Sequence, residues 1–136
     1  MAPDAHPDFF GSQRFTLNLT RADMRRAGYS PSVRLFEAAA CGTPIISDDW
    51  PGLSDLLEPG KEILLAHSAD DVTSVLRDMD HAQARRIADA ARERICAEHS
   101  SAQRALEFER YLNEGLASSH GRRSATDVPH RAAVTS

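Results

Sequence analysis

The sequence predicts an α/β domain with a short parallel sheet of about three strands flanked by helices. Three short apolar runs, at residues 15–20, 44–48 and 62–66, alternate with segments of helical periodicity. Such alternation is typical of strands joined by helical crossovers, which makes the strands parallel. The chain has 136 residues, 41% of them hydrophobic, which is enough for one compact domain.

The first strand and the helix after it are predicted by local composition. Residues 15–20 (FTLNLT) are rich in β-formers and precede a basic loop or helical turn at 21–29. Ser30 then suits a helix N-cap and Pro31 the first helical position, where a missing N–H costs nothing. We expect this helix to run to about Cys41, because a glycine and a proline follow it closely.

The second and third strands are predicted at 44–48 and 62–66. The run at 44–48 breaks into two acids, Asp48 and Asp49, as expected of a central parallel strand whose carboxyl end opens into a site. Turns containing proline and glycine, at 50–52 and 58–60, lead to the third strand.

The remainder of the chain is predicted to be helical, followed by a tail. Apolar residues recur at helical spacing within 70–79, 82–99 and 101–116, and the composition then changes to Ser, His, Arg and Thr without periodicity. We therefore expect an N-terminal segment, one domain and a disordered tail, at residues 1–14, 15–116 and 117–136.

The bulk composition excludes several classes of protein. A formal net charge of −4 gives no general attraction for nucleic acid or anionic membranes. Two cysteines, Cys41 and Cys96, argue against a disulfide framework, and neither a signal peptide nor a run of about 20 apolar residues is visible. The six histidines lack metal-ligand spacing. We expect a cytoplasmic protein without a membrane span, metal or cofactor.

The segment 30–55 carries the candidate chemistry. A capped helix N-terminus presents free N–H groups and a partial positive charge, so the amides near Ser32 and Val33 suit a phosphate. Glu37 follows in an apolar stretch, where a carboxylate needs a partner. Ribose hydroxyls would supply one. The alternative is an ion pair with Arg34 or Arg26, and the residues alone leave both open.

Longer blocks resemble a known group of enzymes. Residues 30–55 resemble the signature of retaining GT-B glycosyltransferases. More narrowly, the stretch from about His6 to Leu112 resembles the C-terminal part of the spore-maturation-protein CgeB-like glycosyltransferase family. The blocks that carry this resemblance are LNLTRADM at 17–24, GYSPSVRLFEAAACGTPIISDDWPGL at 28–53 and EPGKEILLA at 58–66.

The resemblance implies a partial Rossmann-like domain, the C-terminal half of a GT-B fold, with a donor-binding role for particular residues. Glu37 resembles the acid that holds the donor ribose, and Ser32 and Val33, with Ser30 ahead of them, resemble the helix start facing the diphosphate. Pro51, Gly52 and Asp55 stand where the group often has Gly-Gly and a Glu. Tyr29 is a departure, because the wider group commonly has there a second Glu that contacts the transferred sugar.

The arginines of the 21–29 segment are a further open point. The resemblance places the usual donor-phosphate Arg and Lys residues before this chain. Arg21, with Arg25 and Arg26, is a candidate local substitute, and the alternative is a solvated basic loop.

The expected function is binding of a nucleotide-diphosphate sugar, as substrate, for transfer to an acceptor hydroxyl. By the resemblance, the acceptor site belongs to an N-terminal GT-B domain that this chain lacks, so we expect the isolated chain to be inactive and to expose apolar surface that favours self-association. No catalytic residue is assigned. The alternative is a non-catalytic nucleotide-sugar-binding or interaction module, or a truncated gene product.

Overall fold

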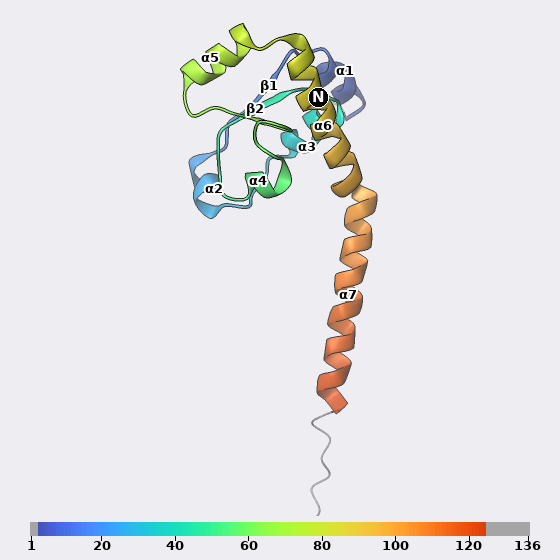
Figure 1. Ribbon diagram of the computed structural model, residues 1–136. Helices are drawn as coiled ribbons and strands as arrows, with labels where there is room; N and C mark the ends of the chain where they lie inside the picture. Colours follow the sequence, from blue (N-terminus) through green and yellow to red (C-terminus); the bar gives the residue numbers. More distant parts are fainter. Residues whose placement is uncertain (1–2, 125–136) are drawn as a thin grey trace, which may run out of the picture. The chain divides into compact units, whose positions relative to one another are not determined.

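The computed structural model describes residues 3–124 of the chain. The chain divides into two compact units, Met1–Ser100 and Ser101–Ser136, and each is described by itself. The first unit holds the sheet and most of the helices, as the ribbon in Figure 1 shows.

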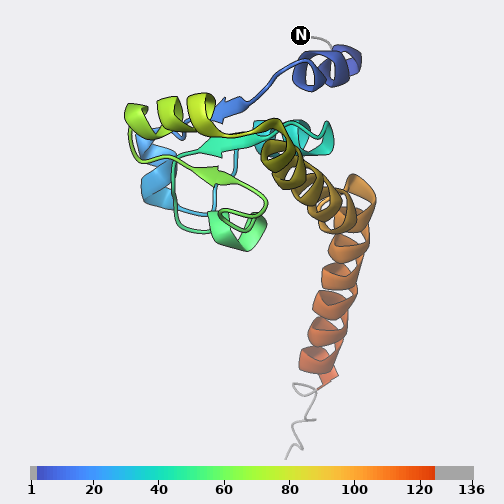
Figure 2. The ribbon, with the colours of Figure 1, turned by 45° about the horizontal axis from the view of Figure 1, so that its top comes forward.

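The sheet has three parallel strands in the order β1-β2-β3. These are β1 (Thr16–Asn18), β2 (Ile45–Ser47) and β3 (Leu64–Leu65), with Thr16 opposite Ile45 and Ile46 opposite Leu64. Figure 2 shows the strands side by side with the same direction. The predicted α/β class and the three parallel strands are therefore confirmed, although each strand is shorter than the apolar run that predicted it.

Six α-helices and one 3-10 turn are described in the first unit. They are η1 (Pro3–Ala5), α1 (His6–Gly11), α2 (Ala22–Ala27), α3 (Val33–Ala40), α4 (Leu53–Leu56), α5 (Ala69–Asp78) and α6 (His81–Glu98).

The predicted start of the helix before β2 is wrong by two residues. Ser32, not Ser30, is the N-cap of α3, and its Oγ accepts a hydrogen bond from the Arg34 amide at 3.4 Å. The loop before α3 is bound to the 50–52 turn, because the Tyr29 amide donates a hydrogen bond to the Pro51 carbonyl at 2.8 Å. Pro31 therefore belongs to this loop, and the second serine supplies the cap.

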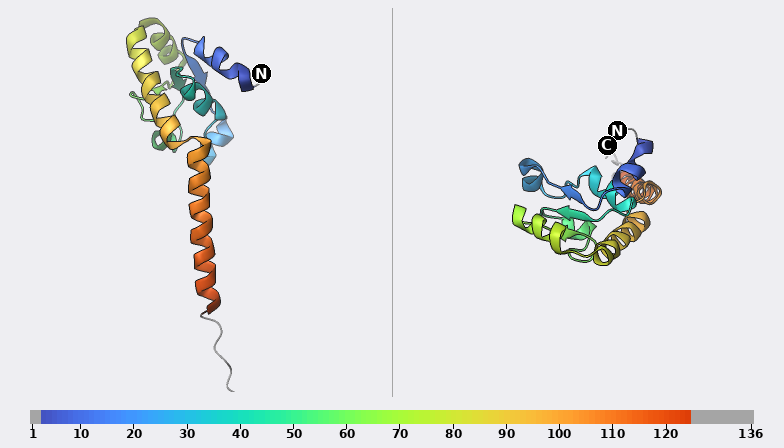
Figure 3. Two further views of the ribbon diagram at one scale, coloured as in Figure 1. Left: turned by 90° about the vertical axis from the view of Figure 1, so that its right-hand side faces the viewer. Right: turned by 90° about the horizontal axis from the view of Figure 1, so that it is seen from above.

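The core lies on both faces of the sheet, and helices lie on both sides of the strands in Figure 3. Ile45 packs in a cluster with α3, α4 and the C-terminal half of α6. Ile46 points the other way, into a cluster with α5 and Ile87 of α6. All three residues of β2 are buried for this reason, as is usual for a central parallel strand.

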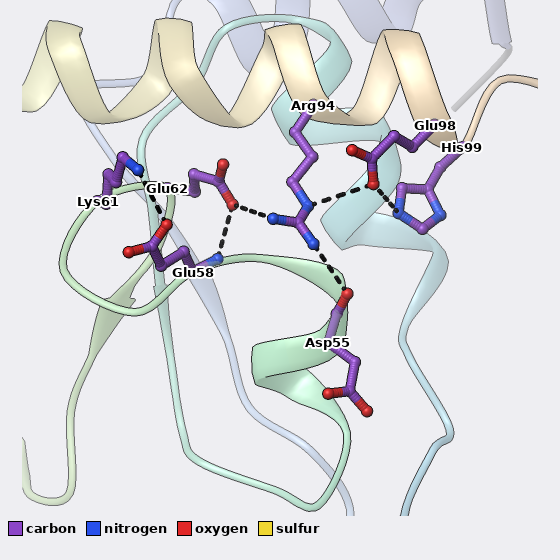
Figure 4. Close-up of polar contacts among 7 residues, drawn as sticks. All are labelled: Asp55, Glu58, Lys61, Glu62, Arg94, Glu98 and His99. Carbon is purple, nitrogen blue, oxygen red and sulfur yellow. Dashed lines mark hydrogen bonds and ion pairs between the residues drawn. The ribbon is translucent and has the colours of Figure 1, made fainter.

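One arginine joins the segment before β3 to α6, as Figure 4 shows. Arg94 of α6 lies 3.5 Å from Glu62, and another of its guanidinium nitrogens donates to the Asp55 carbonyl at 3.1 Å. Glu62 is buried and also accepts from the Glu58 amide at 2.7 Å. Arg94 thus neutralises a buried carboxylate while it fastens α4 to α6.

The second unit contains α7 (Ser101–Ser124), a helix of 24 residues. It extends past the predicted end near Leu116, into the stretch that the sequence assigned to a disordered tail. The rest of that tail, from residue 125 onwards, lies outside the described residues. Within 3–124, no helix is long and apolar enough to cross a bilayer.

We predict that Arg94→Leu destabilises the fold by roughly 1–3 kcal/mol, because it leaves the buried Glu62 carboxylate without its cation. Arg85→Leu is the matched control, since Arg85 is an exposed arginine of the same helix in a surface pair with Asp89. Its effect should stay within about 0.5 kcal/mol. Urea unfolding of both variants measures the difference, and equal midpoints would contradict the proposed role of Arg94.

Candidate functional site

The carboxyl ends of the three strands meet at one edge of the sheet, because the strands are parallel. Open α/β sheets bind ligands at this edge. The loops that leave β1 and β2 are joined there by the Asp48 carboxylate. Its Oδ1 accepts from the amide and the hydroxyl of Thr20, at 3.0 and 2.9 Å, and its Oδ2 lies 3.6 Å from Nε of Arg25. Asp48 therefore fixes the path of the chain between β1 and α2.

The N-terminus of α3 offers a free amide at this end of the molecule. Ser32 caps the helix through its side chain, and its carbonyl accepts from the Leu35 amide at 3.1 Å. None of the described residues accepts a hydrogen bond from the Val33 amide. A free N–H at a helix start, with the partial positive charge of the helix, attracts an anion.

The turn at 50–52 packs against the loop that leads into α3. Tyr29 has a positive φ of 50°, which is uncommon outside glycine, and a Cβ placed on Gly52 would lie 2.5 Å from its ring. Only glycine therefore fits at position 52 in this arrangement. The contact brings Pro51 and Gly52 to the loop that contains Ser30.

A hollow of about 330 Å³ lies beside Pro51, lined also by Ala22, Arg25, Arg26 and Asp49. Arg26 has no ion partner among the described residues, whereas Arg25 is paired with Asp48. Arg21 precedes α2 as its N-cap and is exposed, and it is absent from the lining of this hollow. Of the three candidate cations, Arg26 is thus the one that the structure leaves available next to the turn.

A wider hollow of about 580 Å³ lies on the α5 side of the same edge. Its apolar wall includes Leu17, Leu19, Ala66 and Val72, and Thr20, Arg25 and Asp48 contribute polar groups. Leu17 is 42% exposed and Leu19 is 69% exposed. The apolar run at 15–20 predicted a buried strand here, but β1 buries Thr16 and Asn18 and exposes Leu17. Sequence reasoning therefore missed this apolar surface.

Glu37 lies on α3 one turn after Val33, and its side chain is 33% exposed rather than buried. Its partner among the described residues is neither Arg34 nor Arg26. Oε1 of Glu37 lies 3.1 Å from Nδ1 of His6, in α1. Arg34 instead donates to the Leu17 carbonyl at 3.3 Å. The protein partner of Glu37 is therefore a histidine and not either of the arginines expected as the alternative to ribose.

The signal that could have revealed His6 lies in α1 itself. Phe10, one turn further along this helix, is buried, and its carbonyl accepts from the Thr43 hydroxyl at 2.7 Å. A helix anchored in this way places His6 against α3. The sequence predicted a separate N-terminal segment at 1–14, with a surface or packing role for His6, so it did not link His6 to Glu37.

Asp55 belongs to the short helix α4. Its carbonyl is the group that Arg94 binds, and Figure 4 shows its carboxylate directed away from Arg94. No contact among the described residues joins this carboxylate to Glu37 or to the first turn of α3. The 50–52 turn thus lies against the loop that leads into α3, and Asp55 follows this turn within α4.

Cys41, the C-cap of α3, follows Glu37 by one helical turn. Burial, and secondly the negative charge of Glu37, raise the pKa of the Cys41 thiol. A raised pKa favours the protonated thiol over the nucleophilic thiolate. Across the described part of the chain, no group of three His, Cys, Asp or Glu residues is placed to hold a metal ion.

Comparison with known proteins supports the fold. No curated protein matches the sequence. Among solved structures, the chain is similar to sucrose-phosphate synthase from Thermosynechococcus elongatus, with a TM-score of 0.63 and 22% sequence identity. The similarity covers 81% of this chain and 27% of that one, so the chain spans about a quarter of its relative. The α/β fold is thus similar to that of a GT-B glycosyltransferase.

Comparison with family models gives the wider relationship. A model described as glycosyl transferase-like matches residues 1–110, which include the whole sheet, α3 and the 50–52 turn. The chain therefore belongs to the glycosyl transferase-like family.

Proposed function

We propose that this chain is the donor-binding part of a GT-B glycosyltransferase, which holds a nucleotide-diphosphate sugar for transfer to an acceptor hydroxyl. The observation that carries the proposal is the arrangement at the N-terminus of α3. The Val33 amide is free there, the Pro51-Gly52 turn packs against the loop that leads into the helix, and Glu37 follows Val33 by one turn. Family membership supports a role in glycosyl transfer.

The spacing along α3 suits a nucleotide. Glu37 follows Val33 by four residues, which is about 6 Å along a helix axis. That distance is comparable to the span between a ribose and the phosphates attached to it. One helix would then bind the diphosphate at its N-terminus and the ribose hydroxyls at Glu37, and the nearby Arg26 would add a positive charge to the phosphate end.

Two kinds of interaction would contribute to catalysis. Binding both ends of the nucleotide fixes the position of the sugar, and positioning of this kind lowers the barrier to a reaction with an acceptor. The amide and the arginine would also stabilise the negative charge that develops on the departing diphosphate. We further propose that the chain belongs to the CgeB-like group of these enzymes, on the sequence blocks that resemble it.

A non-catalytic nucleotide-sugar-binding module is the second candidate. Tyr29 favours it, because an aromatic ring stands where the resemblance calls for an acid that contacts the sugar. The ring is 74% exposed, and its backbone is held in the left-handed region by the contact with the 50–52 turn.

We predict that Glu37→Gln lowers the affinity for a nucleoside diphosphate by about ten- to a hundredfold, because it removes charge-assisted hydrogen bonds to the ribose hydroxyls. The amide can still accept the hydrogen bond of His6, so the melting temperature should change little. Calorimetric titration of the full chain with a panel of nucleoside diphosphates, beside thermal unfolding, measures both effects.

Glu93→Gln is the matched control, since Glu93 is exposed on α6 and has no ion partner among the described residues. Its affinity and stability should equal those of the wild type. Unchanged affinity in Glu37→Gln together with a large loss of stability would overturn the ribose assignment and leave Glu37 a structural acid.

We also predict that the purified chain binds the nucleotide but transfers no sugar, because transfer needs an acceptor positioned beside the donor and the resemblance places the acceptor site on a separate domain. The assay measures release of the nucleoside diphosphate from a panel of nucleotide sugars, with simple sugars offered as acceptors. Turnover above the rate of a heat-inactivated sample would show that the chain is catalytically complete and would refute this expectation.

A further inference from the structure

We propose that His6 is a positioning residue for Glu37, so that imidazole and carboxylate act as one unit toward the ribose hydroxyls of the donor. The inference rests on the proposed function, and it adds a residue from outside the 30–55 segment to the site. Nδ1 of His6 lies 3.1 Å from Oε1 of Glu37, which is hydrogen-bond distance.

The geometry sets the direction of this hydrogen bond. An ionised carboxylate is only an acceptor, so Nδ1 of His6 must carry the proton and donate it. Oε1 of Glu37 then accepts from His6, and none of the described residues donates to its Oε2. Oε2 can therefore accept hydrogen bonds from a ligand.

The imidazole is itself held in place by α1. Its ring meets the ring of Phe10 edge to face, with centroids 6.0 Å apart and planes at 84°. Phe10 is buried, and its carbonyl accepts a hydrogen bond from Thr43, two residues before β2. A chain of contacts therefore runs from the core through His6 to Glu37, which fixes the orientation of the carboxylate.

The pair is also accessible to a ligand. The His6 side chain is 23% exposed and that of Glu37 is 33% exposed. Polar contacts between side chains with this degree of exposure contribute little to folding, because water solvates the separated partners. A glutamate side chain that is already ordered loses less conformational entropy when a ligand binds, so the effect of the pair should appear in affinity rather than stability.

Three substitutions at His6 test this role by calorimetric titration of the full chain with UDP, GDP, ADP and CDP. His6→Ala should weaken binding about three- to tenfold, a coupling typical of contacting residues. His6→Asn should restore affinity to within about twofold of the wild type, because the asparagine amide nitrogen takes the place of Nδ1. His6→Gln should behave like alanine, because its amide nitrogen takes the place of Nε2. His81→Ala, at the exposed start of α6, is the control and should bind as the wild type does.

A double-mutant cycle separates positioning from mere structural support. If His6 acts through Glu37, His6→Ala should cause no further loss of affinity in the Glu37→Gln background. Thermal unfolding of each variant identifies any that lose affinity through misfolding. If His6→Ala is one of these, the affinity of His6→Asn decides whether His6 positions Glu37.

The outcomes distinguish the two proposals. If Glu37→Gln weakens binding but His6→Ala does not, or weakens it equally in both backgrounds, the positioning role is wrong and the donor site stands. If Glu37→Gln leaves the affinity unchanged, or no nucleotide binds at millimolar concentration, the ribose assignment and the role of His6 both fall.

Discussion

The candidate site depends on the contacts that the Asp48 carboxylate makes with Thr20 and Arg25. The strands are only two or three residues long, so the backbone ladder alone does little to fix the loops that leave them. Asp48 supplies the missing constraint, because its two oxygens bind Thr20 and Arg25 and so join the end of β2 to the chain after β1. The loop that leads to α3 then packs against the turn after β2, through the Tyr29 and Pro51 contact.

The helix α3 connects this edge of the sheet with the core. Its inner face, with Leu35, Ala38 and Ala39, is buried against the sheet and α6, which fixes the helix axis. Its first turn and Glu37 remain open to a ligand. A polar site built on a well-packed helix is more rigid than one built on loops alone, and rigidity is what the binding of a nucleotide in one orientation requires. The contact from His6 to Glu37 extends this rigidity to the side chain.

Part of this structure follows from the sequence. The runs FTLNL and PIIS and the apolar residues near 62–66 predicted the three parallel strands, because buried strands need such runs whatever their tertiary partners. The start of α3 was harder to predict from the sequence, since Ser30 and Ser32 are both good caps. The choice between them depends on the hydrogen bond from the Tyr29 amide to the distant carbonyl of Pro51.

Two features of the site could not be obtained from local patterns. The partner of Glu37 is separated from it by 31 positions, and tertiary contacts such as the hydrogen bond from Thr43 to the Phe10 carbonyl bring His6 to α3. Leu17 is exposed, although apolar residues of a strand are usually buried. Helices later in the chain determine which residues of β1 are covered. Both are consequences of tertiary packing, which periodicity does not encode.

The most direct test of the account is an NMR titration of the ¹⁵N-labelled chain with a nucleoside diphosphate, with inorganic pyrophosphate as a second titrant. We predict that both ligands shift the amide resonances of Ser32, Val33 and Gly52, and that only the nucleotide shifts those around Glu37 and His6. Shifts confined to the apolar hollow beside α5, or to α7, would contradict the placement of the donor at the start of α3.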